Sequence, residues 1–158
     1  MCPAVAHAET VTRYLINPPG LKDARAIGYN HAVIAEGEFY SAGQVAMNEH
    51  NEIVGSDIGT QARRVFKNVR TLLGSIGKDM PDIAKVTTHI VDPATTYYDG
   101  YKDVYLETFS SPYPAHTVLG ADQLAHPEYL VEVEVELPLT TADINAIEPD
   151  GETIVAVD

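Results

Sequence analysis

The chain has 158 residues, 45% of them hydrophobic, which suits one domain built around one core. It carries 23 acidic and 10 basic residues, and the net charge of −13 repels phosphate backbones and disfavours a general nucleic-acid binder. No apolar run approaches the roughly 18 residues that a membrane span needs, so we expect no membrane partner.

The N-terminal segment offers few signals. Cys2 is the only cysteine, so no intrachain disulfide can form. The segment MCPAVAHAET has no basic region and no long apolar stretch, so we expect no secretory signal and predict a cytoplasmic protein. The acidic charge fits plain solubility and also adaptation to a salty cytoplasm, and both interpretations stay open.

The first third of the chain predicts strands. Residues 10–16 alternate in strand fashion and end at the loop signal Asn17-Pro18-Pro19-Gly20. Two further strands are expected at 31–35 and 38–45. The Glu36-Gly37 turn between them is typical of a β-hairpin.

The clearest helix follows. Ser56 or Asp57 can cap its start, and Gly77 can end it. Its apolar residues recur at helical spacing and form one stripe: Ile58, Ala62, Val65, Phe66, Val69, Leu72, Leu73 and Ile76. The basic residues between them are interpreted as a solvated face rather than a binding patch.

The remaining elements alternate between strand and helix. We predict a strand over 83–91, a second helix over 95–109, and strands over 115–120 and 129–139. The second helix places tyrosines on one face, where we expect them to pack. In the last strand, glutamates alternate with apolar residues, so the two sets face opposite ways.

This order predicts an α+β two-layer sandwich, with a mixed sheet of about six strands and two helices on one face. The uncovered sheet face must be polar or covered by another subunit, which favours an oligomer. We treat residues 1–158 as one domain. Its acidic C-terminal tail, 140–158, contains a segment at 153–157 that can add a strand.

Seven segments follow in the order and spacing of the reactive intermediate deaminase (Rid) family, also called YjgF or endoribonuclease L-PSP. They are GYNHAV, GEFYSAGQV, QARRVFKNVRTLLGSIG, IAKVTTHIVD, GYKDVYLETF, PAHTVL and VEVEVEL. The chain resembles this family from about residue 25 to 137. The resemblance implies a chorismate-mutase-like fold, a homotrimer with a cleft at each subunit interface, no cofactor, and hydrolysis of small-molecule imines and enamines to ketones and ammonia.

The resemblance has one departure in the implied site. Active members carry Pro-Ala-Arg, and that arginine holds the substrate carboxylate, whereas this chain has Pro114-Ala115-His116. An imidazole offers no planar fork of donors and is mostly uncharged at neutral pH. We therefore expect an altered substrate specificity.

Two residues are the catalytic candidates. Glu132 matches the family's water-activating carboxylate, although the strand pattern alone makes it one of three solvent-facing glutamates. His116 can pass a proton at working pH, or it can be an ordinary side chain at a strand start. We predict that His116 faces the subunit cleft within reach of Glu132.

Six residues are candidates for substrate binding. Gly43 lets a ligand approach the backbone, and Lys102 or Arg25 can supply the missing positive charge. The six are Tyr29, His31, Gly43, Lys102, Arg25 and Pro114. The histidine spacing does not fit a zinc site, and a site built from His31, His116 and Glu132 is disfavoured.

Two other functions stay open beside the deaminase hypothesis. The first is a trimer that binds a small metabolite without turnover. The second is a ribonuclease, which the negative charge disfavours.

Overall fold

The computed structural model describes residues 11–157. Cys2, the segment examined for a secretory signal and the first residue of the predicted strand 10–16 lie outside these residues. The strands are β1 (Arg13–Ile16), β2 (Ala32–Ala35), β3 (Glu38–Ser41), β4 (Gln44–Val45), β5 (Lys85–Val91), β6 (Ala115–Ala121), β7 (Val131–Pro138) and β8 (Ile154–Val157). They form one eight-stranded sheet in the order β6-β5-β7-β3-β2-β1-β8, with β4 also paired to β7.

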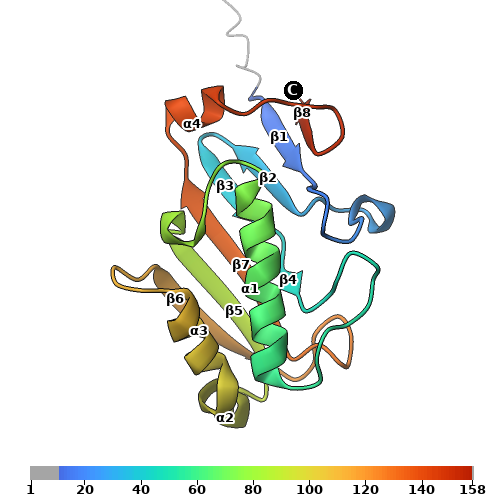
Figure 1. Ribbon diagram of the computed structural model, residues 1–158, viewed down its shortest axis with the longest axis vertical. Coiled ribbons are helices and arrows are strands. Elements are labelled where there is room, and N and C mark those ends of the chain that lie inside the picture. The colour runs from blue at the N-terminus through green and yellow to red at the C-terminus, as the bar shows by residue number, and fades with distance from the viewer. Residues whose placement is uncertain (1–10, 158) are drawn as a thin grey trace, which may run out of the picture.

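The helices are α1 (Ile58–Gly74), α2 (Pro93–Thr96), α3 (Lys102–Thr108) and α4 (Thr141–Asn145), with single turns η1 (Arg25–Ile27), η2 (Met80–Asp82) and η3 (Tyr97–Tyr101). Helices α1, α2 and α3 lie on one face of this sheet, and α4 lies at the end of the sheet where β7 finishes (Figure 1). The β5–β6 pair is parallel and the other strand pairs of the described chain are antiparallel. The predicted α+β class is confirmed. The count of about six strands is low, because the predicted strand 38–45 is broken and the tail adds β8.

Helix α1 forms as its sequence predicts. The Asp57 side chain accepts the backbone N–H of Thr60 at 2.8 Å and caps the first turn. The apolar stripe from Ile58 to Leu73 is buried against the sheet. The helix ends at Gly74, slightly before the predicted Gly77, which lies in the following turn with φ 72°.

The second predicted helix is broken into α2, η3 and α3. The break lies at Asp99 and Gly100, whose backbone angles are not helical. Position 100 favours glycine, because a Cβ there would come within 2.9 Å of the Ile58 Cγ2 on α1. The predicted aromatic face is confirmed, since Tyr101, Tyr105 and Phe109 are buried in the core beneath α1.

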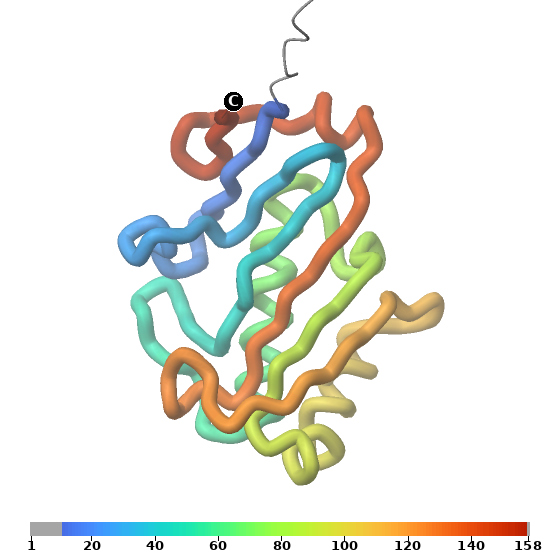
Figure 2. Tube along the Cα trace, turned by 180° about the vertical axis from the view of Figure 1, so that it is seen from behind, coloured from blue at the N-terminus to red at the C-terminus, as the bar shows by residue number. Residues whose placement is uncertain are grey.

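The two faces of β7 differ as the alternation predicts. Val131, Val133, Val135 and Leu137 are fully buried under the helices, and the glutamates between them point to the other face. Figure 2 shows that face, which the helices leave uncovered. It is the face that the sequence analysis expects another subunit to cover.

The sheet is irregular between β3 and β4. Strand β3 pairs with β7 as far as Tyr40 and Glu136, and pairing resumes at Gln44 and Val133. Three residues, 41–43, therefore lie opposite two, 134–135, which is a β-bulge. The bulge turns Gln44 toward the core and Val45 toward the open face. The prediction of one continuous strand over 38–45 is wrong at this point.

The C-terminal tail, as far as residue 157, carries α4 and β8. Strand β8 pairs with β1, from Arg13 opposite Val157 to Ile16 opposite Ile154, which confirms the extra strand expected at 153–157. Within residues 11–157, no helix is long and apolar enough to cross a bilayer.

Candidate functional site

A cleft of about 300 Å³ opens beside the bulge, on the uncovered side of the sheet. Residues from the loop before β2, the bulge, β7 and the loop before β7 line it: Lys22, Ile27, Tyr29, Ala42, Gly43, Val45, Ala125, Tyr129 and Glu132. We call it the Glu132 cleft. Its volume suits a small metabolite. Three predicted site residues, Tyr29, Gly43 and Glu132, come together in it.

Gly43 contributes to the cleft through its lack of a side chain. A Cβ added there would overlap the Oε1 and Cδ atoms of Glu132. The sequence analysis expected a ligand to approach the Gly43 backbone. In this chain the Glu132 carboxylate takes that space, and the bulge is what brings Gly43 under it.

The electrostatic setting of Glu132 differs from that of an exposed glutamate. Burial raises the pKa of the Glu132 carboxyl, and Glu134 adds to the rise, while His89 and Lys22 act against it. His89 lies directly across on β5. A carboxyl group with a raised pKa accepts a proton more readily than an ordinary glutamate and can return it to a bound molecule. The interpretation of Glu132 as merely solvent-facing is therefore disfavoured.

Lys22 is a cleft residue that the sequence analysis missed. Its Nζ lies 5.6 Å from the centroid of the Tyr29 ring, in cation–π contact. Arg25, the cation expected from the same loop, pairs instead with Asp23 at 3.0 Å and donates to the Glu152 carbonyl at 3.2 Å. Arg25 therefore does not line the Glu132 cleft of its own chain, and its entry into the cleft of an adjacent subunit stays a prediction. Nothing in the sequence pattern ranks Lys22 above Arg25.

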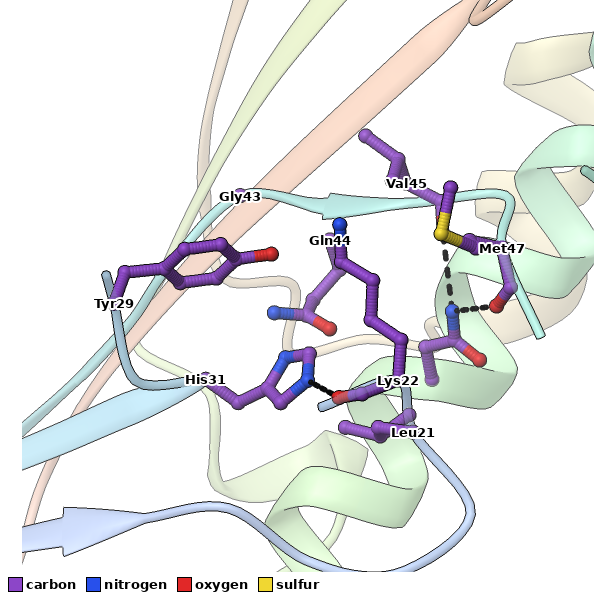
Figure 3. A pocket seen from close by; sticks show the side chains of 9 residues that line it. Leu21, Lys22, Tyr29, His31, Gly43, Gln44, Val45 and Met47 are labelled. Carbon is purple, nitrogen blue, oxygen red and sulfur yellow. Dashed lines mark hydrogen bonds between the residues drawn. The ribbon is translucent and has the colours of Figure 1, made fainter. Parts of the chain in front are cut away.

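His31 lies behind the cleft rather than in it. Its side chain is buried and lines a smaller cavity that shares Lys22, Tyr29 and Gly43 with the Glu132 cleft (Figure 3). The His31 Nε2 donates to the Lys22 carbonyl at 2.8 Å, and burial lowers the pKa of the imidazole. His31 is thus a neutral anchor for the loop that carries Lys22.

His116 points to the opposite face of the sheet from Glu132. It lies in register with Val86 on β5, and Val86 lies in register with Val135 on β7. Both valines are fully buried under the helices. Glu132 lies three residues before Val135 on β7, so its side chain points to the other face of the sheet. The prediction that His116 lies within reach of Glu132 is wrong within one chain.

His116 belongs to a polar cluster beneath α3, which we call the His116 cluster: His116, Thr88, Tyr101 and Tyr105. The imidazole stacks on the Tyr105 ring, with centroids 4.2 Å apart and planes 5° apart. Its Nε2 lies 3.0 Å from the Thr88 Oγ1 and 3.3 Å from the Tyr101 hydroxyl. Burial, with nearby Lys85, lowers the pKa of His116 to about 4, so the ring is neutral at pH 7.

The remaining candidates do not line the Glu132 cleft of the same chain. The Lys102 Nζ lies 5.5 Å from the centroid of the Tyr98 ring, on exposed surface. Pro114 lines a separate cavity beside η2. The disfavoured metal set is not assembled either, and residues 11–157 hold no group of three side chains suited to a metal ion.

Comparison with known proteins shows which family and which relatives this chain is similar to. The family model described as Endoribonuclease L-PSP matches residues 22–136. A 2-iminobutanoate/2-iminopropanoate deaminase of Dermatophagoides farinae is 32% identical over 61% of this chain and 74% of its own. A RutC family protein of Pyrococcus abyssi is 30% identical over 72% of this chain and 88% of its own.

A solved structure shares the fold. The protein YyfA of Yersinia pestis, described as a protein of unknown function of the conserved Rid family, superposes with a TM-score of 0.73 at 26% identity. The superposition covers 80% of this chain and 99% of that protein. The part of this chain outside the family match includes β1 and β8.

Proposed function

The chain belongs to the endoribonuclease L-PSP (YjgF/Rid) family, and we propose that it hydrolyses a reactive imine or enamine to a carbonyl compound and ammonia in the Glu132 cleft. Glu132 is the observation that carries this proposal. It is a half-buried carboxyl group with a raised pKa, seated on Gly43 in a cleft of metabolite size. The relative named as an imine deaminase supports the same chemistry.

The reaction needs one water and one group that moves its proton. The Glu132 carboxylate accepts a proton from water as the water oxygen bonds to the carbon of the C=N group, and it returns that proton to the nitrogen, which gives a carbinolamine. Glu132 then takes the hydroxyl proton of the carbinolamine and passes it to the amine nitrogen, so that the C–N bond breaks, ammonia leaves and the C=O bond forms. A carboxyl group whose pKa is raised by burial is a better proton acceptor than an ordinary glutamate and can still return the proton.

The specificity differs from that of an arginine-bearing relative under this proposal. The residue at the arginine position, His116, is neutral, stacked and turned under α3, and it has no fork of donors to offer. An imine that depends on a two-pronged carboxylate contact at this position is therefore expected to be a poor substrate.

We also propose that the protein is a homotrimer whose neighbouring subunits cover the open sheet face. The apolar side chains exposed on that face support this, since Tyr40 is 46% and Leu119 is 45% exposed in the single chain. Sedimentation analysis that finds a stable monomer at micromolar concentration would contradict the trimer. The cytoplasmic location stays a prediction.

An ammonia-release screen tests the proposed function. Imines with and without a carboxylate are generated in the assay, and the rate is compared with spontaneous hydrolysis. We expect acceleration by the native protein and none by Glu132→Gln. Glu136→Gln is the matched control, because Glu136 lies on the same face of β7 but is exposed. A native protein that binds the carbonyl product without releasing ammonia would favour the metabolite-binding hypothesis instead.

A further inference from the structure

We propose that Lys22 is the anion-binding residue of the Glu132 cleft, and that it holds an acidic group of the substrate while the C=N group lies at Glu132. This inference rests on the proposed function of the cleft. It assigns substrate selection to the loop before β2, on the opposite face of the sheet from the side chain of His116.

The charge distribution supports this role. Lys22 is the one basic side chain among the described residues that line the cleft. It forms no ion pair with any carboxylate of residues 11–157, whereas Arg25, in the same loop, is paired with Asp23. An ammonium group without a carboxylate partner, in a chain with 23 acidic residues, is available to an acidic ligand.

Lys22 and Glu132 share the cleft without pairing. They are not in ion-pair contact, yet the Lys22 charge is close enough to act on the pKa of the Glu132 carboxyl. The cleft of about 300 Å³ that both groups line has room for a small ligand. A small molecule with an acidic group at one end and a C=N group at the other matches this arrangement of cation and carboxylate.

The loop that carries Lys22 is fixed in advance of binding. The buried His31 holds the Lys22 carbonyl at 2.8 Å, and the Tyr29 ring lies beneath the ammonium group. Figure 3 shows Lys22, Tyr29 and Gly43 around one space. A side chain that starts from a fixed backbone loses less entropy when it orders on a ligand.

The tail fixes the same loop from outside. The Asn17 backbone N–H donates to the Thr153 carbonyl at 2.8 Å, and Arg25 donates to the Glu152 carbonyl. These contacts bracket Lys22 in sequence. The segment leading into β8, beyond the family match, therefore helps to position the cation.

The test compares acidic and neutral ligands. The probes are a 2-oxo acid, as the product of an acidic imine, and the corresponding ketone without the carboxylate, both titrated by NMR. Lys22→Met is expected to weaken binding of the oxo acid about tenfold, as for removal of a hydrogen bond to a charged group, and to leave the ketone unchanged. Lys22→Arg should retain most of the oxo-acid affinity.

Lys67→Met is the matched control, because Lys67 is an exposed lysine on the outer side of α1. Thermal denaturation confirms that each variant is folded, and Lys22→Gln replaces Lys22→Met if the latter is not. Equal weakening for both ligands, or none for the oxo acid, would overturn the proposal.

Turnover gives a second, separable readout. In the ammonia assay, Lys22→Met should raise KM for an acidic imine about tenfold while kcat changes little, because the ammonium group holds the acidic group equally in the ground state and the transition state. If the native protein releases no ammonia at all, the proposed function fails, whereas the NMR titration still decides the role of Lys22.

Discussion

The Glu132 cleft and the His116 cluster lie on opposite faces of the same sheet, and they differ in how their polar groups are treated. In the His116 cluster, the imidazole is stacked on an aromatic ring and its Nε2 lies within hydrogen-bond distance of two hydroxyl groups. In the cleft, a lysine and a glutamate face a shared space without pairing. His116, which stands at the position of the family arginine, is part of the packing under α3. Lys22 and Glu132, which form no ion pair with each other, lie beside the β-bulge.

Burial acts on both regions and favours the neutral form in each. It raises the pKa of Glu132 and lowers the pKa of His116 to about 4. Glu132 is thus a weaker acid than an ordinary glutamate, and the imidazole of His116 is uncharged at pH 7. This comparison supports the proposed proton transfer at Glu132 and favours a structural role for His116 within its own chain.

The largest expected effect is on turnover at the cleft. Glu132→Gln should lower kcat for imine hydrolysis by at least about a hundredfold, because the amide cannot accept the water proton. His116→Gln should lower it by less than about tenfold while reducing stability. Ammonia release and thermal denaturation measure the pair. A hundredfold decrease in His116→Gln would break the comparison, since it would mean that His116 reaches a cleft across a subunit interface.

Gly43→Ala should have the next largest effect. The added methyl overlaps the Glu132 carboxylate and must displace it, so we expect a fall in kcat of about 10- to 100-fold from misplacement of the base. Gly74→Ala is the control, because a Cβ at the end of α1 meets no atom within 4 Å. It should leave turnover unchanged. Native turnover in Gly43→Ala would show that the seat of Glu132 on Gly43 is unimportant.

Substitutions of two tyrosines test the structural role of the His116 cluster. Tyr101→Phe removes a hydroxyl that bonds Thr88 at 2.7 Å in the core, and should lower the free energy of unfolding by about 1 to 2 kcal/mol. Tyr105→Phe removes a buried hydroxyl without a partner in the described chain, and should be neutral or stabilising. Urea unfolding measures both. A larger destabilisation in Tyr105→Phe than in Tyr101→Phe would reverse the roles inferred here.

The smallest expected effect is the pH dependence of stability, which has opposite sign in the two regions. His116 has a pKa near 6.5 unfolded and about 4 folded, so the unfolded chain binds more protons between these values. Stability from this group is present above pH 6.5 and is lost as the pH falls toward 4, by about 1 kcal/mol for a half-exposed ring. His31 acts in the same direction.

Glu132 behaves in reverse. Its pKa is raised in the folded state, so its contribution is present at low pH and is lost as the pH rises through the folded value. Denaturant unfolding from pH 4 to 7 measures both groups. His116→Gln should flatten the decline toward acid, and Glu132→Gln should steepen it. Identical profiles for the two variants would contradict the assigned pKa directions.

The sequence predicts the parts of the fold that are coded locally. Helix α1 carries its cap and its apolar stripe within a single segment, and β7 carries a strict alternation. The bulge is different, because Ser41, Ala42 and Gly43 fit a straight strand as well as a bulged one. The break at Gly100 also depends on a distant contact, with Ile58 on α1.

The sequence predicts the direction of a site side chain when that direction follows from the alternation of its own strand. Glu132 lies as its alternation requires, and Tyr29 and Gly43 join it through segments that match the family. The direction of His116 depends on how β6 registers against β5, and the sequence does not encode that pairing locally. Lys22 has no motif. Only the folded loop shows that this lysine, rather than Arg25, enters the cleft.

The bulge between β3 and β4 interrupts the regular strand pairing at the point where the Glu132 cleft lies. Deletion of one residue from 41–43 would let the segment 38–45 run as a straight strand with an unbroken ladder to β7, and Gln44 would stay on the same face as Phe39. An idealised strand of that kind is the solution that stability alone would select, but it would lose the bulge in which the Gly43 backbone lies against the Glu132 carboxylate. The irregular segment is therefore where selection for activity and selection for stability oppose each other, and stabilising redesign of this protein should leave it untouched.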